Sequence, residues 1–577
     1  MSDAIEAFRR HRQALLEHRA DYDAARRAVE PRFGVDPAAP FNWALDWLDP
    51  WALAHADETA LRIVDVDDED VAHRTFGEIR ARSNRAANVL RGLGVERGDR
   101  VLLMLPNVAP LWEVMVAAIK LGAVIVPATT LLEGDDLSDR LDRGHIKHVV
   151  TTRAQVDKLE ARLGEQTRVL VDGPAPGWTF LEEAIASAAA GFAPRAPSVA
   201  GDPLLLYFTS GTTSKPKLVL HSHASYPVGH LSTMYWLGLQ PGDLHLNVSS
   251  PGWAKHAWSN VFAPWNAGAG VFVLAHPRFE PEAALRSLVA RGVTTMCAAP
   301  TVWRLLIQQD LSAHPVALRE MASAGEPLNP SVIEALRDAW GLVPRDGYGQ
   351  TETTAQIANS PGQEVRLGSM GRAMPGYDVV LLDGEGAETT GEGQVALRLD
   401  DARPIGLMMG YDGDRARSEQ VLGGSHYLTG DVATMDADGY LTYVGRADDV
   451  FKSSGYRISP FELESVVVRH PAVAEAAVVP SPDATKHTVP KAFVALRPGH
   501  APSEGLALDI LRFARAELSP FKRVRRLEFA ELPKTVSGKI RRVALRDGEA
   551  ERVRDRPDAD RGTTVFWSED FGERLRG

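Results

Sequence analysis

The sequence contains a single cysteine, Cys297, no long apolar run and no surplus of basic residues. One cysteine excludes an intrachain disulfide and a zinc site built from cysteines. No stretch approaches the roughly 18 consecutive apolar residues of a transmembrane helix. The first residues include Asp3 and Glu6 and lack the apolar segment of a secretory signal. These absences predict a protein of the reducing cytoplasm without stable membrane insertion.

Charge and composition narrow the class of protein further. The 577 residues carry 64 Lys and Arg against 76 Asp and Glu, so the net charge is −12. Because nucleic-acid-binding proteins usually carry a basic surplus, that class is disfavoured. Apolar residues make up 44% and charged residues 24% of the chain, as in average globular proteins. Only 12 of the 64 basic residues are lysines, so each lysine is mildly informative in this arginine-rich chain.

Hydrophobic patterning predicts two kinds of sheet. Between about 75 and 300, helical stretches alternate with short apolar runs, which indicates βαβ units and mainly parallel pairing. From about 365 to 445, short runs between Gly- and Asp-rich turns predict a small antiparallel or barrel-like unit. The expected helices are 5–30, 41–54, 80–94, 110–121 and 506–518, and the expected strands are 100–105, 123–128, 148–151, 204–208, 270–274, 294–299, 379–382, 394–399, 440–444, 476–479, 491–496 and 525–529.

A compact piece follows Arg446, and we place a domain boundary there. The expected domains are residues 1–445, residues 446–548 and a charged tail, 549–577. The tail ends in an aromatic group, Val565–Trp567 and Phe571. Docking of this tail onto the N-terminal domain and plain disorder are equally compatible with its sequence.

The strongest local pattern is an apolar strand, 204–208, that runs directly into hydroxyl residues and lysines. Backbone N–H groups, hydroxyls and ammonium groups on such a loop can hold a polyphosphate. The spacing is neither that of a Walker A loop nor that of a Rossmann fingerprint. A polar surface loop is the alternative. The residues concerned are Thr209, Ser210, Gly211, Thr212, Thr213, Ser214, Lys215 and Lys217.

Four further segments give weaker evidence of a ligand-binding role when each is taken singly. Segment 346–352 offers glycines for close approach to a flat ligand, an aromatic face and a carboxylate for Mg²⁺. Segment 427–431 ends in an aspartate that could bind a ribose diol. Segment 445–457 falls on the domain boundary, and segment 532–542 is a basic loop that could deliver a lysine. The alternatives are ordinary turns, a solvated linker and an isolated basic loop.

Taken together, in this order and at these separations, the five segments resemble the adenylate-forming superfamily of acyl-CoA synthetases, luciferases and peptide-synthetase adenylation domains. The resemblance covers roughly residues 40–550 and looks closest to the medium-chain acyl-CoA synthetases, through 251–258, 262–265, 299–302 and 323–327. Leu218 stands where most of the superfamily has glycine, as in the medium-chain branch. The resemblance implies an α/β fold: a large N-terminal domain with two mainly parallel α/β sheets and a small β-barrel-like unit, and a smaller, mobile α+β C-terminal domain.

The resemblance also implies a two-step reaction with ATP, Mg²⁺ and CoA. A carboxylate attacks the α-phosphate of ATP to give acyl-AMP and pyrophosphate, and the CoA thiol then displaces AMP. The implied catalytic residues are Lys539, Thr351 and Glu352, with Glu352 on Mg²⁺. The implied ATP-binding residues are Thr209–Lys217, Glu326, Asp346, Gly347, Tyr348, Gly349, Gln350, Asp431 and Arg446. Asp448 is the implied hinge, and Ser454, Gly455, Tyr456 and Arg457 would border the CoA tunnel.

The acyl pocket is expected to involve Trp253, His256, Gly325 and Gly349. Acetyl-CoA synthetases, which resemble this sequence, place a tryptophan where Gly349 stands, so Gly349 predicts open space and an acid larger than propionate. An apolar pocket gains about 0.8 kcal/mol per buried CH₂ but separates neighbouring chain lengths poorly. His256 stands where we expect a small residue, and it either narrows the pocket, bonds a polar substituent or is a satisfied helix histidine. His221 and His223 lack a nearby carboxylate, which disfavours a metal site.

The leading function is therefore an acyl-CoA synthetase for a medium-chain, branched or aromatic acid. The alternative is an adenylating enzyme that loads a separate carrier protein. The joint presence of Lys539, Glu352, Asp431 and Arg446 disfavours a nucleotide-binding scaffold with a degenerate site. An oxygenase of the luciferase type is remote, because no feature of the sequence indicates a chromophore substrate. The sequence leaves open a homodimer as well as a carrier protein as partners.

Overall fold

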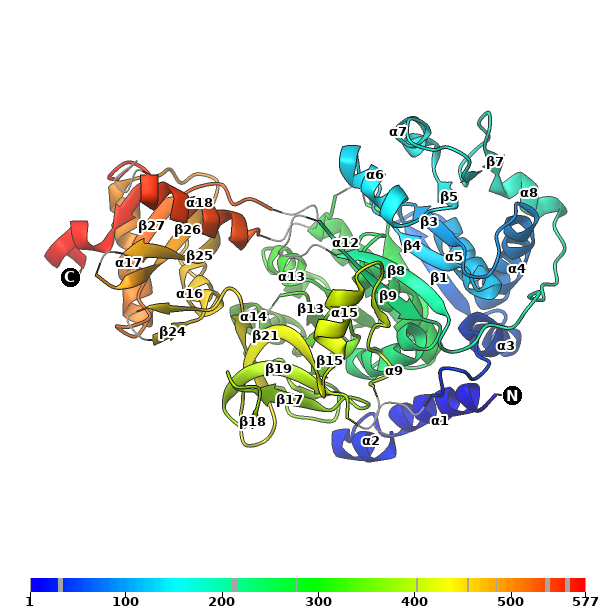
Figure 1. The fold of residues 1–577 in the computed structure, drawn as a ribbon, viewed down its shortest axis with the longest axis horizontal. Helices are drawn as coiled ribbons and strands as arrows, with labels where there is room; N and C mark the ends of the chain where they lie inside the picture. Colours follow the sequence, from blue (N-terminus) through cyan, green and yellow to red (C-terminus); the bar gives the residue numbers. More distant parts are fainter. Residues whose placement is uncertain are drawn as a thin grey trace. The chain divides into compact units, whose positions relative to one another are not determined.

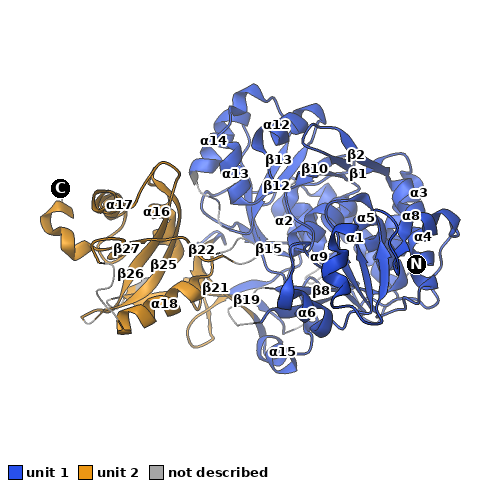
Figure 2. Cartoon of the chain, turned by 90° about the horizontal axis from the view of Figure 1, so that it is seen from above, with its two compact units in different colours: residues 1–380, 396–427, 436–441 blue, residues 381–395, 428–435, 442–577 orange. Residues whose placement is uncertain are grey.

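The computed structural model describes residues 2–29, 35–209, 215–276, 278–326, 328, 330–400, 403–453, 456–483, 485–534, 540–555 and 561–575. The chain divides into two compact units, which Figure 2 shows in two colours. Unit 1 comprises residues 1–380, 396–427 and 436–441. Unit 2 comprises residues 381–395, 428–435 and 442–577. The last segment of unit 2 thus begins four residues before the boundary that we expected at 446.

A nine-stranded sheet forms one layer of unit 1 (Figure 1). Its six central strands, from β14 to β1, pair in parallel, and the strands at both edges are antiparallel. In spatial order its strands are β16 (Arg372–Ala373), β15 (Ala355–Ala358), β14 (Arg345–Gly349), β13 (Glu320–Ala324), β12 (Thr295–Ala298), β10 (Leu244–Asn247), β11 (Gly270–Leu274), β1 (Thr59–Val64) and β2 (Asp70–Thr75).

An eight-stranded sheet forms a second layer of unit 1. Strands β8 to β7 pair in parallel, and β8, β9 and β20 pair antiparallel. In spatial order its strands are β20 (Gly410–Tyr411), β9 (Lys217–Ser222), β8 (Pro203–Thr209), β4 (Val124–Pro127), β3 (Arg100–Met104), β5 (His148–Thr151), β6 (Thr167–Leu170) and β7 (Thr179–Phe180).

Helices α5 and α9 each contact strands of both large sheets. All thirteen residues of α9 are buried, and its sequence has no polar face, as expected for a helix covered on every side. The helices of unit 1 are α1 (Asp3–Glu17), α2 (Tyr22–Ala28), α3 (Asp49–Ala54), α4 (Phe76–Gly92), α5 (Ala109–Leu121), α6 (Gly134–Arg143), α7 (Val156–Glu160), α8 (Leu181–Ser187), α9 (Ser225–Leu237), α10 (Ala254–Ala257), α11 (Ala263–Ala267), α12 (Pro281–Ala290), α13 (Pro300–Leu306), α14 (Pro330–Trp340) and α15 (Arg415–Leu422). Short π- and 3₁₀-helices are η2 (Ala44–Leu48), η3 (Arg153–Gln155), η4 (Trp258–Phe262) and η5 (Leu311–Ala313).

A five-stranded sheet lies where we predicted the small antiparallel or barrel-like unit. Its order is β18 (Glu388–Thr389), β17 (Val379–Leu382), β19 (Glu392–Arg398), β21 (His426–Met435) and β22 (Leu441–Arg446). Residues of this sheet belong to both units. Unit 2 holds the hairpin β23 (Phe451–Ser453) and β24 (Tyr456–Ile458) and the sheet β25 (Val473–Asp483), β26 (His487–Leu496), β27 (Arg526–Phe529) and β28 (Val565–Trp567). Its helices are α16 (Pro460–Val467), α17 (Glu504–Glu517), α18 (Arg542–Asp555) and the 3₁₀-helix η6 (Ser568–Leu575).

The end of the chain differs from our expectation of a separate charged tail. Helix α18 runs through the expected boundary at 549, and β28 pairs antiparallel with β27. Phe566 and Phe571 are buried in the core of unit 2. The aromatic group of the tail therefore completes the sheet of unit 2, and neither docking onto unit 1 nor disorder describes residues 565–575. Short β-strands with two or three apolar residues are hard to distinguish from loops in a sequence.

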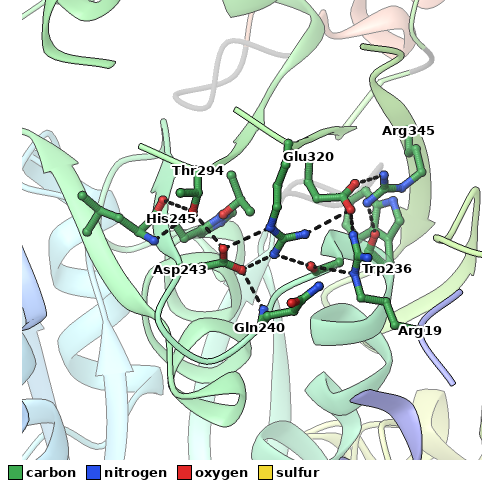
Figure 3. A network of polar contacts seen from close by, with 12 residues as sticks. Arg19, Trp236, Gln240, Asp243, His245, Thr294, Glu320 and Arg345 are labelled. Atoms are coloured by element: carbon green, nitrogen blue, oxygen red, sulfur yellow. Dashed lines mark hydrogen bonds and ion pairs between the residues drawn. The ribbon is translucent and has the colours of Figure 1, made fainter. Parts of the chain in front are cut away.

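A network of charged side chains ties the amino ends of β13 and β14 to the end of α9 (Figure 3). Glu320 pairs with Arg345, Arg319 and Arg19, and Arg319 also binds Asp243. Arg319 donates to the Gly238 carbonyl at 2.8 Å, and Arg345 donates to the Trp236 carbonyl at 2.9 Å. Cations at a helix C-terminus are favourable, and each buried carboxylate here has a partner. The network holds the amino ends of β13 and β14 in place. The opposite, carboxyl ends of these two strands carry the candidate functional site described below.

No helix in the described ranges combines the length and the apolar character that crossing a membrane requires.

Candidate functional site

The predicted phosphate loop joins two paired strands of unit 1. Strand β8 ends at Thr209, which pairs with Lys217, the first residue of β9. Residues 210–214, which include Ser210, Gly211, Thr212, Thr213 and Ser214, lie outside the described residues. Their role in phosphate binding stays a prediction. The antiparallel pairing nevertheless holds the base of the loop, and with it Lys217, in a defined position.

Glu352, Tyr411 and Lys217 meet beside the base of this loop. The Tyr411 hydroxyl donates to Glu352 Oε1 at 2.9 Å, and Lys217 Nζ lies 3.9 Å from the same oxygen. Lys217 Nζ also lies 3.4 Å from the Tyr411 hydroxyl and 5.1 Å from the centre of its ring. Strand β20 places Tyr411 there, because Tyr411 pairs with Val219 of β9. Sequence reasoning missed Tyr411, which lies 59 residues from Glu352 and carries no motif.

The chemistry of these groups suits a magnesium ion that shares its coordination with a substrate. Mg²⁺ usually takes one or two protein carboxylates and fills its remaining positions with phosphate oxygens and water. Glu352 supplies a carboxylate that is 12% exposed, next to a cation from the phosphate loop. Within the described residues, no group of three or more His, Cys, Asp or Glu side chains is placed to form a complete metal cage. The arrangement therefore fits Mg²⁺ that arrives with ATP.

His221 holds the backbone of Thr351, the residue expected at the α-phosphate. His221 Nε2 donates to the Thr351 carbonyl at 2.7 Å, and the Ser225 hydroxyl lies 3.0 Å from Nδ1. Burial lowers the pKa of His221 to about 4, against the opposing effect of the Thr351 carbonyl. The ring is therefore neutral at pH 7, with the proton on Nε2. His221 positions the Thr351–Glu352 turn, a role that the sequence did not reveal.

Asp346 lies on β14 with an unusual carboxyl group. Burial raises its pKa to about 7, although the N–H groups of Gly347 and Leu328 and the charge of Lys255 act in the opposite direction. Asp346 Oδ1 accepts from the Gly347 N–H at 3.0 Å. Of the other predicted adenine residues, Tyr348 is half-buried like Asp346, and Glu326 is exposed, 4.0 Å from Arg304.

The raised pKa of Asp346 predicts that the stability of unit 1 depends on pH. The pKa of Asp346 is higher in the folded than in the unfolded state, so the folded state binds the proton more tightly. The bound proton therefore stabilises the fold, and this stabilisation is lost as the pH rises from about 4 to 7. Asp346→Asn removes this penalty and is expected to stabilise unit 1 by at most about 4 kcal/mol at pH 8, and by no more than about 1 kcal/mol at pH 4.5. Melting temperatures at both pH values test this. An equal change at both values, or the same pattern in the exposed control Asp338→Asn, would contradict it.

Two glycines of this segment are required by close packing. A Cβ at Gly347 would lie 2.3 Å from the Trp236 ring. A Cβ at Gly349 would lie 2.3 Å from the Thr354 carbonyl oxygen. The space next to Gly349 is therefore filled by backbone in this structure, which corrects our reason for expecting open space there. Gly325 is different, because its Cβ direction meets no described residue within 4 Å.

The acyl-pocket candidates Trp253 and His256 lie on one short helix. Trp253 caps α10 and is half-buried. His256 is buried, 2.9 Å from Asn107 Oδ1, and its ring packs against Trp112. Burial lowers the pKa of His256 to about 3, so the ring is neutral. Of the readings that we left open, the structure favours a histidine satisfied by its neighbours.

Unit 2 contributes a second group of predicted residues. Asp431 is buried, and its Oδ1 lies 3.3 Å from the Tyr443 hydroxyl and 3.7 Å from Arg446 Nη1. Arg446 Nε lies 3.3 Å from Asp448 Oδ1. Burial alone would lower the pKa of Arg446, but the carboxylates of Asp431 and Asp448 raise it above its ordinary value. Asp431 and Arg446, which we expected to share the ribose, are neighbours within this unit.

The hinge and CoA candidates are only partly described. Asp448 is exposed, and its carbonyl accepts from Arg546 at 2.8 Å. Tyr456 is exposed and stacks on Phe521 at 4.5 Å. Ser454, Gly455 and Lys539 lie outside the described residues, as does the side chain of Arg457. Their assignments stay predictions.

Comparisons with known proteins find related families and relatives along most of the chain. A family model described as AMP-binding enzyme matches residues 48–411, and one described as AMP-binding enzyme C-terminal domain matches residues 462–539. The chain is 41% identical to a 4-hydroxybutyrate–CoA ligase of Metallosphaera sedula, over 89% of this chain and 91% of that protein. It is 37% identical to the acyl-coenzyme A synthetase ACSM3 of Mus musculus, over 94% and 96%.

Solved structures that are similar to this chain are also CoA ligases. The fold is similar to an anthranilate CoA ligase in complex with anthranoyl-AMP, with a TM-score of 0.79 and 31% identity, over 88% of this chain and 97% of that chain. It is also similar to a benzoate CoA ligase from Burkholderia xenovorans, with a TM-score of 0.75 and 29% identity, over 88% and 100%. These likenesses confirm the predicted fold class.

Proposed function

The chain belongs to the AMP-binding enzymes, and from this premise we propose that it activates a medium-chain, branched or aromatic acid, larger than propionate. Its relatives are acyl-CoA synthetases, and it is an ATP-dependent, AMP-forming acid–thiol ligase. The observation that carries the assignment to this chain's own residues is the contact of Glu352 with Tyr411 and Lys217 at the base of the phosphate loop.

The first half-reaction joins two anions. The substrate carboxylate attacks the α-phosphorus of ATP, the bond to the β-phosphate breaks, and pyrophosphate leaves. Glu352 would hold Mg²⁺, which would neutralise phosphate charge when ATP is bound. Lys217 and the loop donors hold the leaving pyrophosphate, and His221 keeps the Thr351 backbone in place for the α-phosphate and the carboxylate. Such fixed charges act most strongly where water is excluded.

The second half-reaction transfers the acyl group. The CoA thiol loses its proton, its sulfur attacks the acyl carbonyl, and AMP leaves with the electrons of the C–O bond. We assign Ser454–Arg457 to the pantetheine path and Asp448 to a hinge that exchanges the two orientations of the C-terminal domain. Lys539 serves the first half-reaction only. Domain closure in two orientations is an established way for one enzyme to complete two sites.

The size of the acid can be measured directly. We expect CoA-dependent turnover across acetate to dodecanoate, benzoate, isobutyrate and hydroxy acids to peak at an acid larger than propionate. Relatives named for 4-hydroxybutyrate and for benzoate support that range. A maximum at acetate or propionate would contradict it. Because hydrophobic pockets separate adjacent homologues by only about 10–200-fold, several acids should react.

Loading of a separate carrier protein is the second candidate, since adenylation is the same in both cases. Parallel assays with free CoA and with a holo-carrier protein separate the two. Faster thioester formation on the carrier would replace the CoA assignment. A cytoplasmic location stays a prediction from the single cysteine and from the lack of a secretory signal or a long apolar run, and the names of several relatives include the word mitochondrial.

A further inference from the structure

Helix α6 packs against the two strands that carry the predicted phosphate loop. Leu137 and Leu141, four residues apart on α6, lie in the same buried apolar cluster as Phe208 of β8 and Leu218 of β9. Residues at this spacing share one face of a helix. Phe208 is the last but one residue of β8, and Leu218 is the second residue of β9. Helix α6 is therefore fixed beside both strands at the base of the loop.

Arg143 of α6 holds the backbone where β9 begins. Arg143 Nη2 donates to the Pro216 carbonyl at 2.8 Å, and Nη1 lies 3.0 Å from Asp139 Oδ2. The guanidinium is planar, so the ion pair with Asp139 fixes the direction in which the other donors point. The Pro216 carbonyl and the Lys217 N–H belong to one planar peptide group. Arg143 therefore sets the orientation of the peptide at which Lys217 starts.

A second arginine of α6 contacts the other side of the loop base. The Arg140 guanidinium lies 4.0 Å from the centre of the Phe208 ring, and that of Arg143 lies 5.8 Å from the same point. Burial lowers the pKa of Arg140 to about 10, so the group is still charged at pH 7. A cation over an aromatic face is attracted to it. The two arginines thus contact the end of β8 as well as the start of β9.

The carboxyl end of α6 is tied to a third strand by Arg100 of β3. Arg100 Nη1 donates to the Gly144 carbonyl at 3.2 Å and lies 2.9 Å from Asp412 Oδ2. Gly144 caps α6, and Asp412 follows Tyr411, the last residue of β20, whose hydroxyl bonds Glu352. The end of α6 is therefore linked to the backbone next to Tyr411.

Both groups that face Glu352 are thus held from α6. The Tyr411 hydroxyl donates to Glu352 Oε1 at 2.9 Å. Lys217 Nζ lies 3.9 Å from the same oxygen, beyond the length of a direct hydrogen bond, so a small shift of its backbone changes this contact. Displacing a positioned group by about 1 Å can lower a rate by about 10²-fold. The contacts of α6 with Pro216 and, through Arg100, with β20 therefore bear on the geometry of the proposed Mg·ATP site.

We propose that Arg143, supported by Arg140, is a positioning residue for the half-reaction that releases pyrophosphate. Arg143 holds the Pro216 carbonyl so that Lys217 stays beside Glu352. This inference rests on the proposed function, in which Glu352 would hold Mg²⁺ and Lys217 binds the leaving pyrophosphate. Arg143 acts through Lys217 and not on the reacting atoms. Its loss should therefore affect only the steps in which the β- and γ-phosphates are bound.

Arg143→Met tests the inference by separating ligands with and without these phosphates. We expect KM for Mg·ATP and the inhibition constant of pyrophosphate to rise about tenfold, because a hydrogen bond from a charged donor is lost. KM for the acid, inhibition by AMP and thioester formation from synthetic acyl-AMP and CoA should stay within about twofold, because none of them involves the β- and γ-phosphates. Arg143→Lys keeps one charged donor and should restore most of the affinity for ATP.

Arg162→Met is the matched control, because Arg162 is an exposed arginine of unit 1 that donates to the Lys158 carbonyl. Melting temperatures show which variants are folded. If Arg143→Met does not fold, Arg140→Met carries the test, with the same pattern of changes at smaller size.

Two results would overturn the inference and leave the proposed function intact. One is an unchanged KM for Mg·ATP in the folded variant, and the other is an equal loss in both half-reactions. Absence of pyrophosphate release by the unaltered enzyme with every acid would overturn both the inference and the proposed function.

Discussion

Replacement of Lys539 by alanine is expected to slow acyl-AMP formation by about 10³-fold, equivalent to about 4 kcal/mol in the activation barrier. The physical reason is electrostatic. A carboxylate and a triphosphate repel each other, and a lysine that contacts both the carboxylate and the α-phosphate offsets that repulsion where water is excluded. Lys539 itself lies outside the described residues, but its loop has a defined base. Lys534 and Ile540 form an antiparallel bridge, and the Arg541 N–H donates to the Pro533 carbonyl at 2.8 Å.

The two half-reactions should respond differently to this change. Acyl-AMP formation is followed by pyrophosphate release, and the second half-reaction is followed by supplying synthetic acyl-AMP and CoA. We expect Lys539→Ala to keep the second rate within a few-fold. Lys534→Ala is the matched control, because Lys534 sits at the base of the same loop and pairs with Glu475. Wild-type acyl-AMP formation in Lys539→Ala would refute the assignment, as would an equal loss in Lys534→Ala.

Glu352→Gln is expected to lower kcat/KM for ATP by about 10²-fold or more, and to raise the Mg²⁺ concentration needed for half-maximal activity. The carboxylate accepts from Tyr411 and faces Lys217, so it lies where a metal could bridge it to the phosphates. Glutamine keeps an oxygen for the Tyr411 hydroxyl but removes the charge that attracts the metal. The fold should therefore persist while the metal dependence changes.

A titration of activity against Mg²⁺ at fixed ATP measures this effect. Glu419→Gln is the control, because Glu419 is an exposed acid of unit 1 that pairs only with Arg415 in the described contacts. If Glu352→Gln lost activity with an unchanged Mg²⁺ dependence, Glu352 would act through the position of Tyr411 and Lys217, and our assignment to the metal would be wrong.

Much of the fold could be predicted because its signals are local. The expected strands at 148–151, 270–274 and 379–382 match β5, β11 and β17 in both bounds. Each is a short apolar run between polar turns, which is the composition of a fully buried strand. The five motifs gave the family, because a set of motifs in fixed order is far more specific than any one of them.

The rest depends on contacts between distant residues. Tyr411 reaches Glu352 only because β20 pairs with β9. Lys255 contacts Asn247 at the end of β10 and Ala324 at the end of β13, although Asn247 and Ala324 are far apart in the sequence. Gly349 shows the limit of reasoning from residue size, since the Thr354 backbone fills the space that a missing side chain was expected to leave. Burial of the chain's aromatic end in unit 2 likewise follows from a three-residue strand that few local signals mark.

The most direct measurement is pyrophosphate release from Mg·ATP with a butyrate-sized acid, in the presence and absence of CoA. Our account predicts slow release without CoA, limited by retained acyl-AMP, and a strong acceleration by CoA with one AMP and one acyl-CoA formed per pyrophosphate. Pyrophosphate release that CoA does not accelerate, or no release with any acid tested, would contradict the conclusion that this chain joins carboxylic acids to CoA.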